Sequence, residues 1–219
     1  MSGSDVDRRK LNFARWLTPP APRVVFTQPH ILTAQAFATP AICDWLIEWA
    51  RPRLTASKVY DPSTGQGQDR TDIRNNSAAS FTIADFDLVL VMLRARVAQF
   101  AGVREEDFEP PMVLHYAAGE QFAPHFDFIE PSEPSLATDI ARHGQRVGTF
   151  LLYLNDGYEG GETAFSDLGW QHKGAKGDAL LFWNTDADGQ PDRRTLHAGT
   201  MVTAGEKWVL SQWIRRRPV

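Results

Sequence analysis

Three residues of this chain have the types and spacing of an iron site: His125, Asp127 and His197. Only one residue separates His125 from Asp127. Because side chains alternate between two faces in an extended strand, both would point to the same side of one strand. His197 adds a second imidazole from far along the chain. Two histidines and one carboxylate bind one face of an octahedral iron(II) and leave three positions open.

This motif alone is weak evidence, because short metal motifs are hypotheses and a His-x-Asp pair is common by chance. The other histidines have no acidic partner at strand spacing. His30, His143 and His172 lie in polar or loop contexts, and His115 lies on a strand without such a partner. The surrounding elements must therefore support the metal hypothesis.

Short strands separated by glycine turns are the elements that must position these residues. We predict strands at 23–26, 59–60, 112–116, 125–128, 147–154, 162–165, 179–183 and 207–214, and a polar loop at 130–145. Many short strands with regular turns are typical of a jelly roll or barrel. The predicted fold class is α+β but mainly β: a double-stranded β-helix, or jelly roll, with N-terminal helices packed on one sheet.

Two amphipathic helices are predicted in the N-terminal half. The first begins at Thr39-Pro40, with threonine as N-cap and proline at the first helical position, and ends at Arg51-Pro52. The second begins near Thr82, where Asp85 resembles the partner in a capping box, and ends at Gly102. Both helices should pack against the outside of a sheet.

The last strand carries a lysine on an unusual face. Period two puts Lys207 on the same side as Val209, Ser211 and Trp213. A buried ammonium needs an anionic partner, and a dicarboxylate bound near the metal would supply one. The alternative is an edge strand with Lys207 in solvent. On strand 147–154, Thr149, Leu151 and Tyr153 share a face that suits a cavity lining.

Length and composition indicate a single globular domain. The chain has 219 residues, of which 42% are hydrophobic and 23% charged. We predict a flexible leader at residues 1–22 and one domain at 23–219. The net charge of -4 argues against nucleic-acid binding. No apolar stretch reaches the length of a membrane helix, and no secretory signal is visible. With Cys43 as the single cysteine, we predict a cytoplasmic location.

Together these residues resemble the catalytic domain of prolyl 4-hydroxylases, which are iron(II)- and 2-oxoglutarate-dependent dioxygenases. The resemblance runs from about Pro29 to Arg216. It rests on Tyr116-Ala-Ala-Gly-Glu-Gln-Phe-Ala-Pro-His125-Phe-Asp127, Arg146-Val-Gly-Thr149-Phe-Leu-Leu-Tyr153, Gly160-Gly-Glu-Thr163, His197-Ala and Gly205-Glu-Lys207-Trp. These motifs occur in the family's order and spacing.

The resemblance implies roles for several residues. His125, Asp127 and His197 would bind iron. Lys207 and Thr163 would hold the distal carboxylate of 2-oxoglutarate, Tyr116 would add a hydroxyl, and Trp213 would pack beside the chelating end. Dioxygen is the other cosubstrate, and ascorbate is the expected reductant.

Substrate contacts are less determined. Arg146 matches a family arginine that faces the substrate; the alternative is a structural ion pair with a loop acid such as Asp139. The family often has tyrosine where this chain has Phe122, three residues before the first metal ligand. We expect Pro124 to bend the strand so that Phe122 approaches the cavity mouth. Arg70 and Arg74 are interpreted as solvated loop charges, with substrate contact as the alternative.

The predicted function is hydroxylation of an unactivated C–H bond, with a peptidyl proline as the expected target. The partner would then be a peptide or protein, with a proline-rich sequence as one option, and neither nucleic acid nor membrane is expected. The same chemistry on a free amino acid or another side chain stays open, as does the oligomeric state. A metal-binding jelly roll without catalysis is disfavoured, because such a site needs no lysine clamp for a dicarboxylate.

Overall fold

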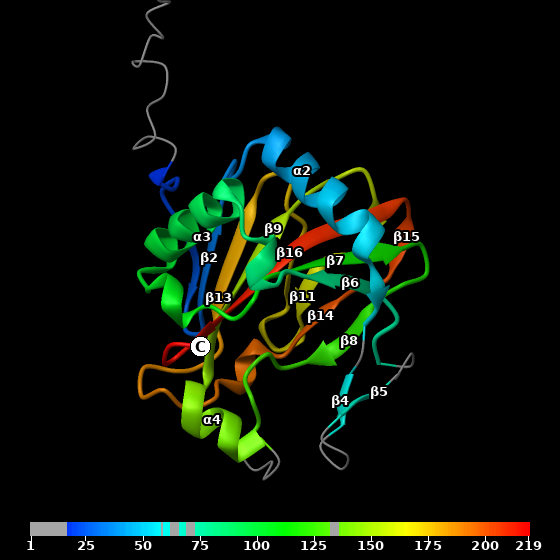
Figure 1. Cartoon of the computed structure of the whole chain (residues 1–219). Coiled ribbons are helices and arrows are strands. Elements are labelled where there is room, and N and C mark those ends of the chain that lie inside the picture. The colour runs from blue at the N-terminus through cyan, green and yellow to red at the C-terminus, as the bar shows by residue number, and fades with distance from the viewer. Residues whose placement is uncertain (1–16, 58, 62–65, 69–72, 132–135) are drawn as a thin grey trace, which may run out of the picture.

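The computed structural model describes residues 17–57, 59–61, 66–68, 73–131 and 136–219 (Figure 1). Most of the predicted leader, residues 1–16, and Arg70 lie outside these ranges. The division into a leader and one domain stays a prediction.

Two facing antiparallel sheets form the body of the protein. The larger has eight strands in the order β1-β2-β13-β9-β16-β7-β6-β3, and the smaller has four in the order β12-β11-β14-β8. The strands of the larger sheet are, in that order, Arg23–Thr27, His30–Ala34, Ala179–Trp183, Arg146–Tyr153, Glu206–Arg215, Met112–Ala117, Ser77–Ser80 and Thr55–Ala56. Those of the smaller are Trp170–His172, Thr163–Phe165, His197–Gly199 and Phe122–His125. The predicted jelly roll is therefore confirmed.

Short hairpins and helices complete the described part of the chain. β4 (Val59–Asp61) pairs with β5 (Gln66–Gln68), and β10 (Glu159–Gly160) pairs with β15 (Val202–Ala204). The main helices are α2 (Pro40–Ala50), α3 (Leu88–Ala101) and α4 (Ala137–His143). None of the helices described here is long and apolar enough to span a membrane.

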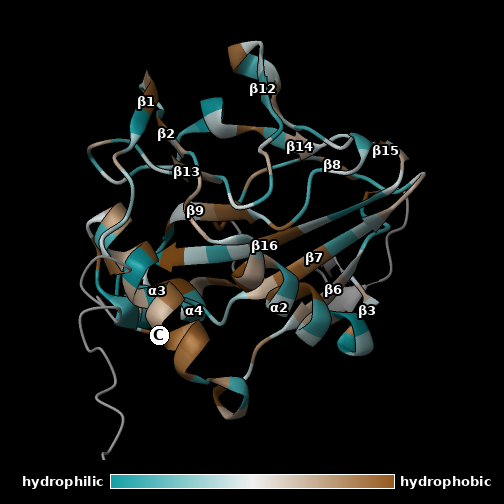
Figure 2. Cartoon of the chain, turned by 90° about the horizontal axis from the view of Figure 1, so that it is seen from above, coloured by the Kyte–Doolittle hydropathy of each residue, from teal (hydrophilic) through white to brown (hydrophobic). Residues whose placement is uncertain are grey.

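The helices α2 and α3 cover the outer face of the larger sheet, as predicted. Figure 2 shows three layers: these helices, the strands β9, β16 and β7, and then β8, β14 and β12 on the far side. Phe150, Leu152 and Leu210 face the helices and pack in one buried cluster with Leu46 and Leu93. Burial of this apolar surface holds the helices on the sheet.

The inner face of the same sheet carries a different set of side chains. Leu151 and Tyr153 of β9 and Val209 of β16 form a second buried cluster, separate from the helix-facing one. Because β9 and β16 alternate with period two, each strand contributes both to the outer core and to the space between the sheets. The shared faces predicted for these two strands are confirmed.

Three predicted elements are wrong in their limits or type. The Thr82 capping box exists, since the amide of Thr82 donates to Asp85 at 2.8 Å, but it closes only a 3-10 turn, Ile83–Asp85. The helix begins six residues later, where Asp87 caps the amide of Leu90 at 3.0 Å. The segment 130–145 contains α4. The strand predicted at 125–128 ends at His125.

Leu152 tests how strongly the outer core stabilises the domain. This side chain is fully buried near the C-terminal end of β9. Leu152→Ala should lower the free energy of unfolding by about 2–5 kcal/mol, because it leaves a cavity between sheet and helices. Urea denaturation measures this loss. The control is Leu88→Ala: Leu88 is 69% exposed, and its loss should stay within about 0.5 kcal/mol. Equal effects would contradict this account of the core.

Candidate metal centre

Strand pairing brings the two predicted histidine ligands together. β14 pairs antiparallel with β8, and His197 lies directly opposite His125 in that register. His125 is the last residue of β8 and His197 is the first of β14. The imidazole centroids are 4.3 Å apart. One pair of neighbouring strands thus brings together two histidines that lie far apart in the sequence.

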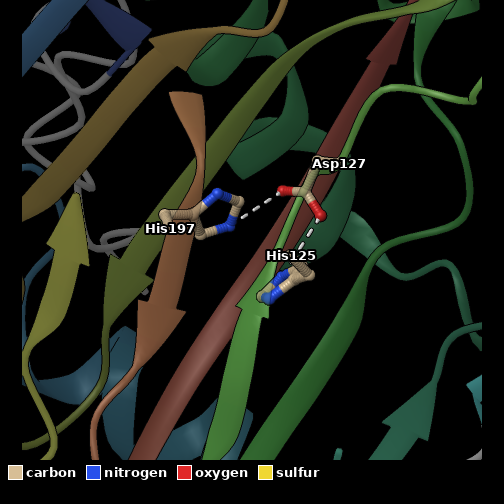
Figure 3. Close-up of side chains that lie close together, drawn as sticks. All are labelled: His125, Asp127 and His197. Atoms are coloured by element: carbon tan, nitrogen blue, oxygen red, sulfur yellow. Dashed lines mark ion pairs between the residues drawn. The ribbon is translucent and has the colours of Figure 1, made fainter. Parts of the chain in front are cut away.

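Asp127 reaches the same point by a different route from the one predicted. It lies in a bend just after β8, not on the strand with His125. Its carboxylate nevertheless points at both rings (Figure 3): Oδ1 is 3.7 Å from Nε2 of His125, and Oδ2 is 3.5 Å from Nε2 of His197. One ligand atom from each residue lies within 4.8 Å of the others.

Backbone carbonyls fix the orientation of both imidazoles. Nδ1 of His125 is 2.8 Å from the carbonyl of Ala123, and Nδ1 of His197 is 2.9 Å from that of Thr195. A carbonyl only accepts, so each Nδ1 carries the proton and each Nε2 keeps its lone pair for a metal. This support of a ligating imidazole by a second acceptor is typical of metal sites.

The electrostatics of the cluster also favour a cation. Burial, followed by the neighbouring His197, lowers the pKa of His125 to about 3, so the ring is neutral at physiological pH. Burial alone would raise the pKa of Asp127, but the histidines and a hydrogen bond from Thr149 together lower it. Two imidazoles and one carboxylate are the ligand set of a non-haem iron(II) site.

A cavity extends from these ligands between the two sheets. It is lined by Arg74, Met112, Leu114, Tyr116, Phe122, His125, Asp127, Leu151, Thr163, His197, Gly199, Lys207, Val209, Ser211 and Trp213. All four residues assigned by resemblance to 2-oxoglutarate belong to this lining. The inner faces of β7, β9, β11 and β16 meet here, as period two predicted for β9 and β16.

Lys207 is buried at one wall of the cavity, so the edge-strand alternative is wrong. The residue is 3% exposed, and burial lowers its pKa to about 8 despite the opposing effect of Glu162. Its ammonium donates to the carbonyl of Gly161 at 2.6 Å, and no carboxylate of the described residues lies within ion-pair distance. Because an ammonium has three donors, this group fits a carboxylate ligand.

The cavity that contains this ammonium is also lined by Tyr116, Thr163 and Trp213. The Tyr116 ring lies 5.3 Å from Nζ of Lys207, and burial raises the pKa of Tyr116 to about 12. The hydroxyl of Thr163 is 2.9 Å from that of Tyr153. Nε1 of Trp213 is buried without a hydrogen-bond partner among the described residues. Their roles toward 2-oxoglutarate stay predictions.

Arg146 is held by an acid that the sequence did not indicate. Its Nε and Nη2 donate to the two carboxylate oxygens of Glu109 at 2.6 and 2.9 Å. The guanidinium also lies 3.8 Å from the ring centroid of Trp213. The specific alternative partner, Asp139, instead pairs with Arg215. Arg146 therefore packs against Trp213, which lines the cavity, and its contact with the substrate stays a prediction.

Phe122 lines the cavity and lies beside the metal centre, on a strand that is irregular where Pro124 is expected to bend it. Between the pairs His197–His125 and Gly199–Phe122 the register shifts, so β8 holds one extra residue. This bulge places the Phe122 ring on the His125 ring, with centroids 3.5 Å apart and planes at 13°. On the other side of Phe122 lies the guanidinium carbon of Arg74, at 4.5 Å. The interpretation of Arg74 as a solvated charge is wrong.

Comparison with known proteins identifies the family. A model of the 2OG-Fe(II) oxygenase superfamily matches residues 111–215. Prolyl 4-hydroxylase 1 of Arabidopsis thaliana is 36% identical over 210 residues, which cover 90% of this chain and 72% of that relative. The chain belongs to the prolyl 4-hydroxylase family of these oxygenases. Prolyl 4-hydroxylases of this superfamily require iron(II), 2-oxoglutarate and dioxygen, and this protein is a 2-oxoglutarate-dependent dioxygenase.

Solved structures agree with this assignment. The viral collagen prolyl hydroxylase of Paramecium Bursaria Chlorella virus-1, in complex with 2OG, is 26% identical, with a TM-score of 0.64 over 84% of this chain and 95% of that one. A Trichoplax adhaerens prolyl hydroxylase with a hypoxia inducible factor peptide fragment has a TM-score of 0.61 at 14% identity, over 84% of this chain and 83% of that one. The second likeness shows the fold alone. The donor set and the buried Lys207 fit the family's metal and cosubstrate.

Asp127 supplies the only anionic ligand of the predicted iron site. Asp127→Ala should weaken iron(II) binding by more than about 100-fold, since loss of an outer-shell partner alone costs about 10–100-fold. Anaerobic titration with iron(II) measures the affinity, and circular dichroism should show an unchanged fold. Asp188→Ala, at an exposed acid, is the control. Wild-type affinity in Asp127→Ala would remove this residue from the site.

Lys207 should control the cosubstrate without controlling the metal. A charge-assisted contact with a carboxylate contributes about 1.5–3 kcal/mol, so Lys207→Ala should raise the dissociation constant for 2-oxoglutarate by about one to two decades. Iron(II) affinity should change little. Titration of 2-oxoglutarate measures the effect, and Lys176→Ala, which removes a lysine paired with Asp44 outside the cavity, is the control. An unchanged titration curve would exclude Lys207 from the cosubstrate site.

Proposed function

We propose that this protein hydroxylates a proline residue in a peptide or protein. The observation that carries the proposal is one cavity that joins the His125, Asp127 and His197 cluster to the buried ammonium of Lys207. The relative in Arabidopsis thaliana that is 36% identical is named a prolyl 4-hydroxylase, which supports proline as the target.

The residues of the chain divide the work between metal, cosubstrate and substrate. When bound, iron(II) with 2-oxoglutarate and dioxygen supplies the oxidising power that converts an unactivated C–H to C–OH, with succinate and carbon dioxide as products. His125 and His197 would hold the metal with their Nε2 atoms, and Asp127 with its carboxylate; all three groups are oriented in advance. Lys207 and Thr163 would orient the distal carboxylate of the cosubstrate, and Tyr116 would add its hydroxyl.

The wall around the site excludes water and orients the substrate. Leu151 and Val209 keep the inner face apolar between the ligands and Lys207. Trp213 is held by the guanidinium of Arg146, which Glu109 fixes through two hydrogen bonds. A guanidinium fixed in this way can offer its remaining N–H groups to a peptide carbonyl at the mouth.

Phe122 is compatible with a peptide substrate, because its ring can pack against a proline side chain. The family often has a tyrosine at this position, so a hydroxyl donor is missing here. The ring lies on His125 and lines the cavity, where it can pack against a pyrrolidine ring. We further propose ascorbate as the reductant, on the ground of the reaction's chemistry. We propose the cytoplasm as the location, because the chain has a single, buried cysteine, Cys43.

A turnover assay distinguishes the candidate substrates. The protein is incubated with iron(II), 2-oxoglutarate, ascorbate and either a proline-rich peptide, the same peptide with each proline replaced by alanine, or free L-proline. We expect a mass gain of one oxygen in the proline-rich peptide only. Hydroxylation of free proline alone would assign a free amino acid as substrate. Absence of 2-oxoglutarate turnover under every condition would support the non-catalytic alternative.

Arg146 should matter for the substrate more than for the cosubstrate. Arg146→Gln removes a charged donor to the peptide, so peptide-coupled turnover should fall about ten- to a hundredfold. Uncoupled decarboxylation of 2-oxoglutarate should fall far less. Both rates are measured by succinate release, with and without peptide, and Arg142→Gln, at an exposed residue of α4, is the control. Equal losses in the two assays would contradict the substrate role.

A further inference from the structure

We infer that Asn184 positions the metal-ligating carboxylate of Asp127 through the hydroxyl of Thr149. Asn184 follows the last residue of β13 and is fully buried, and Thr149 of β9 is 1% exposed. Nδ2 of Asn184 lies 3.0 Å from Oγ1 of Thr149, which lies 2.8 Å from Oδ2 of Asp127. The three groups form a continuous hydrogen-bonded chain inside the protein.

The direction of this chain follows from the chemistry of its members. A metal-ligating carboxylate is ionised and can only accept hydrogen bonds, so Thr149 must donate its single hydroxyl proton to Asp127. The atom of Asn184 that faces Thr149 must then be a donor, which is the amide nitrogen. The carbonyl Oδ1 of Asn184 faces away and has no hydrogen-bond partner among the described residues. Asn184 therefore holds the Thr149 proton toward Asp127.

This arrangement assigns different tasks to the two oxygens of Asp127. Oδ2 accepts from Thr149 and lies 3.5 Å from Nε2 of His197, while Oδ1 lies 3.7 Å from Nε2 of His125. Asp127 follows the end of β8, so the sheet ladder does not fix its backbone as it fixes that of His125 and His197. The hydrogen bond from Thr149 is what sets the rotation of the carboxylate. Outer-shell partners of this kind tune metal affinity.

The backbone of Asn184 also makes hydrogen bonds at the start of the segment that leads to His197. Its amide donates to the carbonyl of Val147 at 2.8 Å, and its carbonyl accepts from the amide of Asp192 at 2.9 Å. The Thr195 hydroxyl in turn donates to the carbonyl of Asp192 at 2.7 Å, and the Thr195 carbonyl accepts from His197. Asn184 thus lies where the supports of two metal ligands meet.

A double-mutant cycle on metal affinity tests the relay without any substrate. Cobalt(II) is the probe, because its visible absorption reports coordination and it does not oxidise readily; iron(II) is titrated anaerobically in parallel. Thr149→Val should weaken binding by about 10–100-fold, and Thr149→Ser should restore it. Asn184→Ala should weaken binding by about tenfold. Thr149→Val with Asn184→Ala should bind no more weakly than Thr149→Val alone, because the amide acts only through the hydroxyl.

Thermal unfolding of the metal-free proteins separates positioning from general stability. Asn155→Ala is the matched control, because Asn155 makes two hydrogen bonds at the other end of β9 and touches no ligand. It should lower the melting temperature but not the cobalt affinity. Wild-type affinity in Asn184→Ala would overturn the inference, as would losses that multiply in the double mutant. The inference rests on the metal site and not on the substrate, so failure of proline hydroxylation would leave these affinities unaffected.

Discussion

The pairing of β14 with β8 is the contact on which the functional site depends. It sets His197 opposite His125, and the next pairing, β11 with β14, sets Phe165 opposite His197 and Thr163 opposite Gly199. One small sheet therefore carries both imidazoles and a hydroxyl. Thr149, Lys207 and Trp213 come from the facing sheet. The site exists only where the two sheets face each other, so no single segment can form it.

Because each strand has two faces, apolar burial on the outer face can offset the free-energy cost of burying polar groups on the inner face. On β16, Trp208 and Leu210 pack in the apolar core beneath the helices, whereas Lys207 and Ser211 line the cavity. A buried ammonium is costly because it loses its hydration, which lowers the pKa of Lys207 to about 8. The outer core offsets that cost without entering the site. Sequence changes on one face can thus alter the chemistry while the other face keeps the fold.

The sequence predicted most of the site because strand periodicity carries most of it. Motif spacing was enough to select His125 and Asp127, and period two was enough for the faces of β9 and β16. What failed depends on tertiary contacts: Asp127 lies beyond the strand, and α4 is polar and docks through Arg215 and Arg217, which leaves no apolar stripe to detect. The Glu109 partner of Arg146 and the contact of Arg74 with Phe122 also arise from distant segments. Local signals misplaced the start of α3, because Thr82 and Asp87 both satisfy capping rules.

Glu109 connects the helical layer to an aromatic residue that lines the cavity. Its carboxylate accepts from Arg146 and lies 3.2 Å from Nε of Arg215, so one acid partly neutralises two arginines. Its backbone carbonyl accepts from Gln212 at 2.6 Å and from Arg94 of α3 at 3.3 Å. Since Arg146 lies against Trp213, a chain of contacts runs from α3 on the outer face to an aromatic wall on the inner face. The helices therefore bury the outer face of the sheet, and α3, through Glu109, helps to hold Arg146 against Trp213.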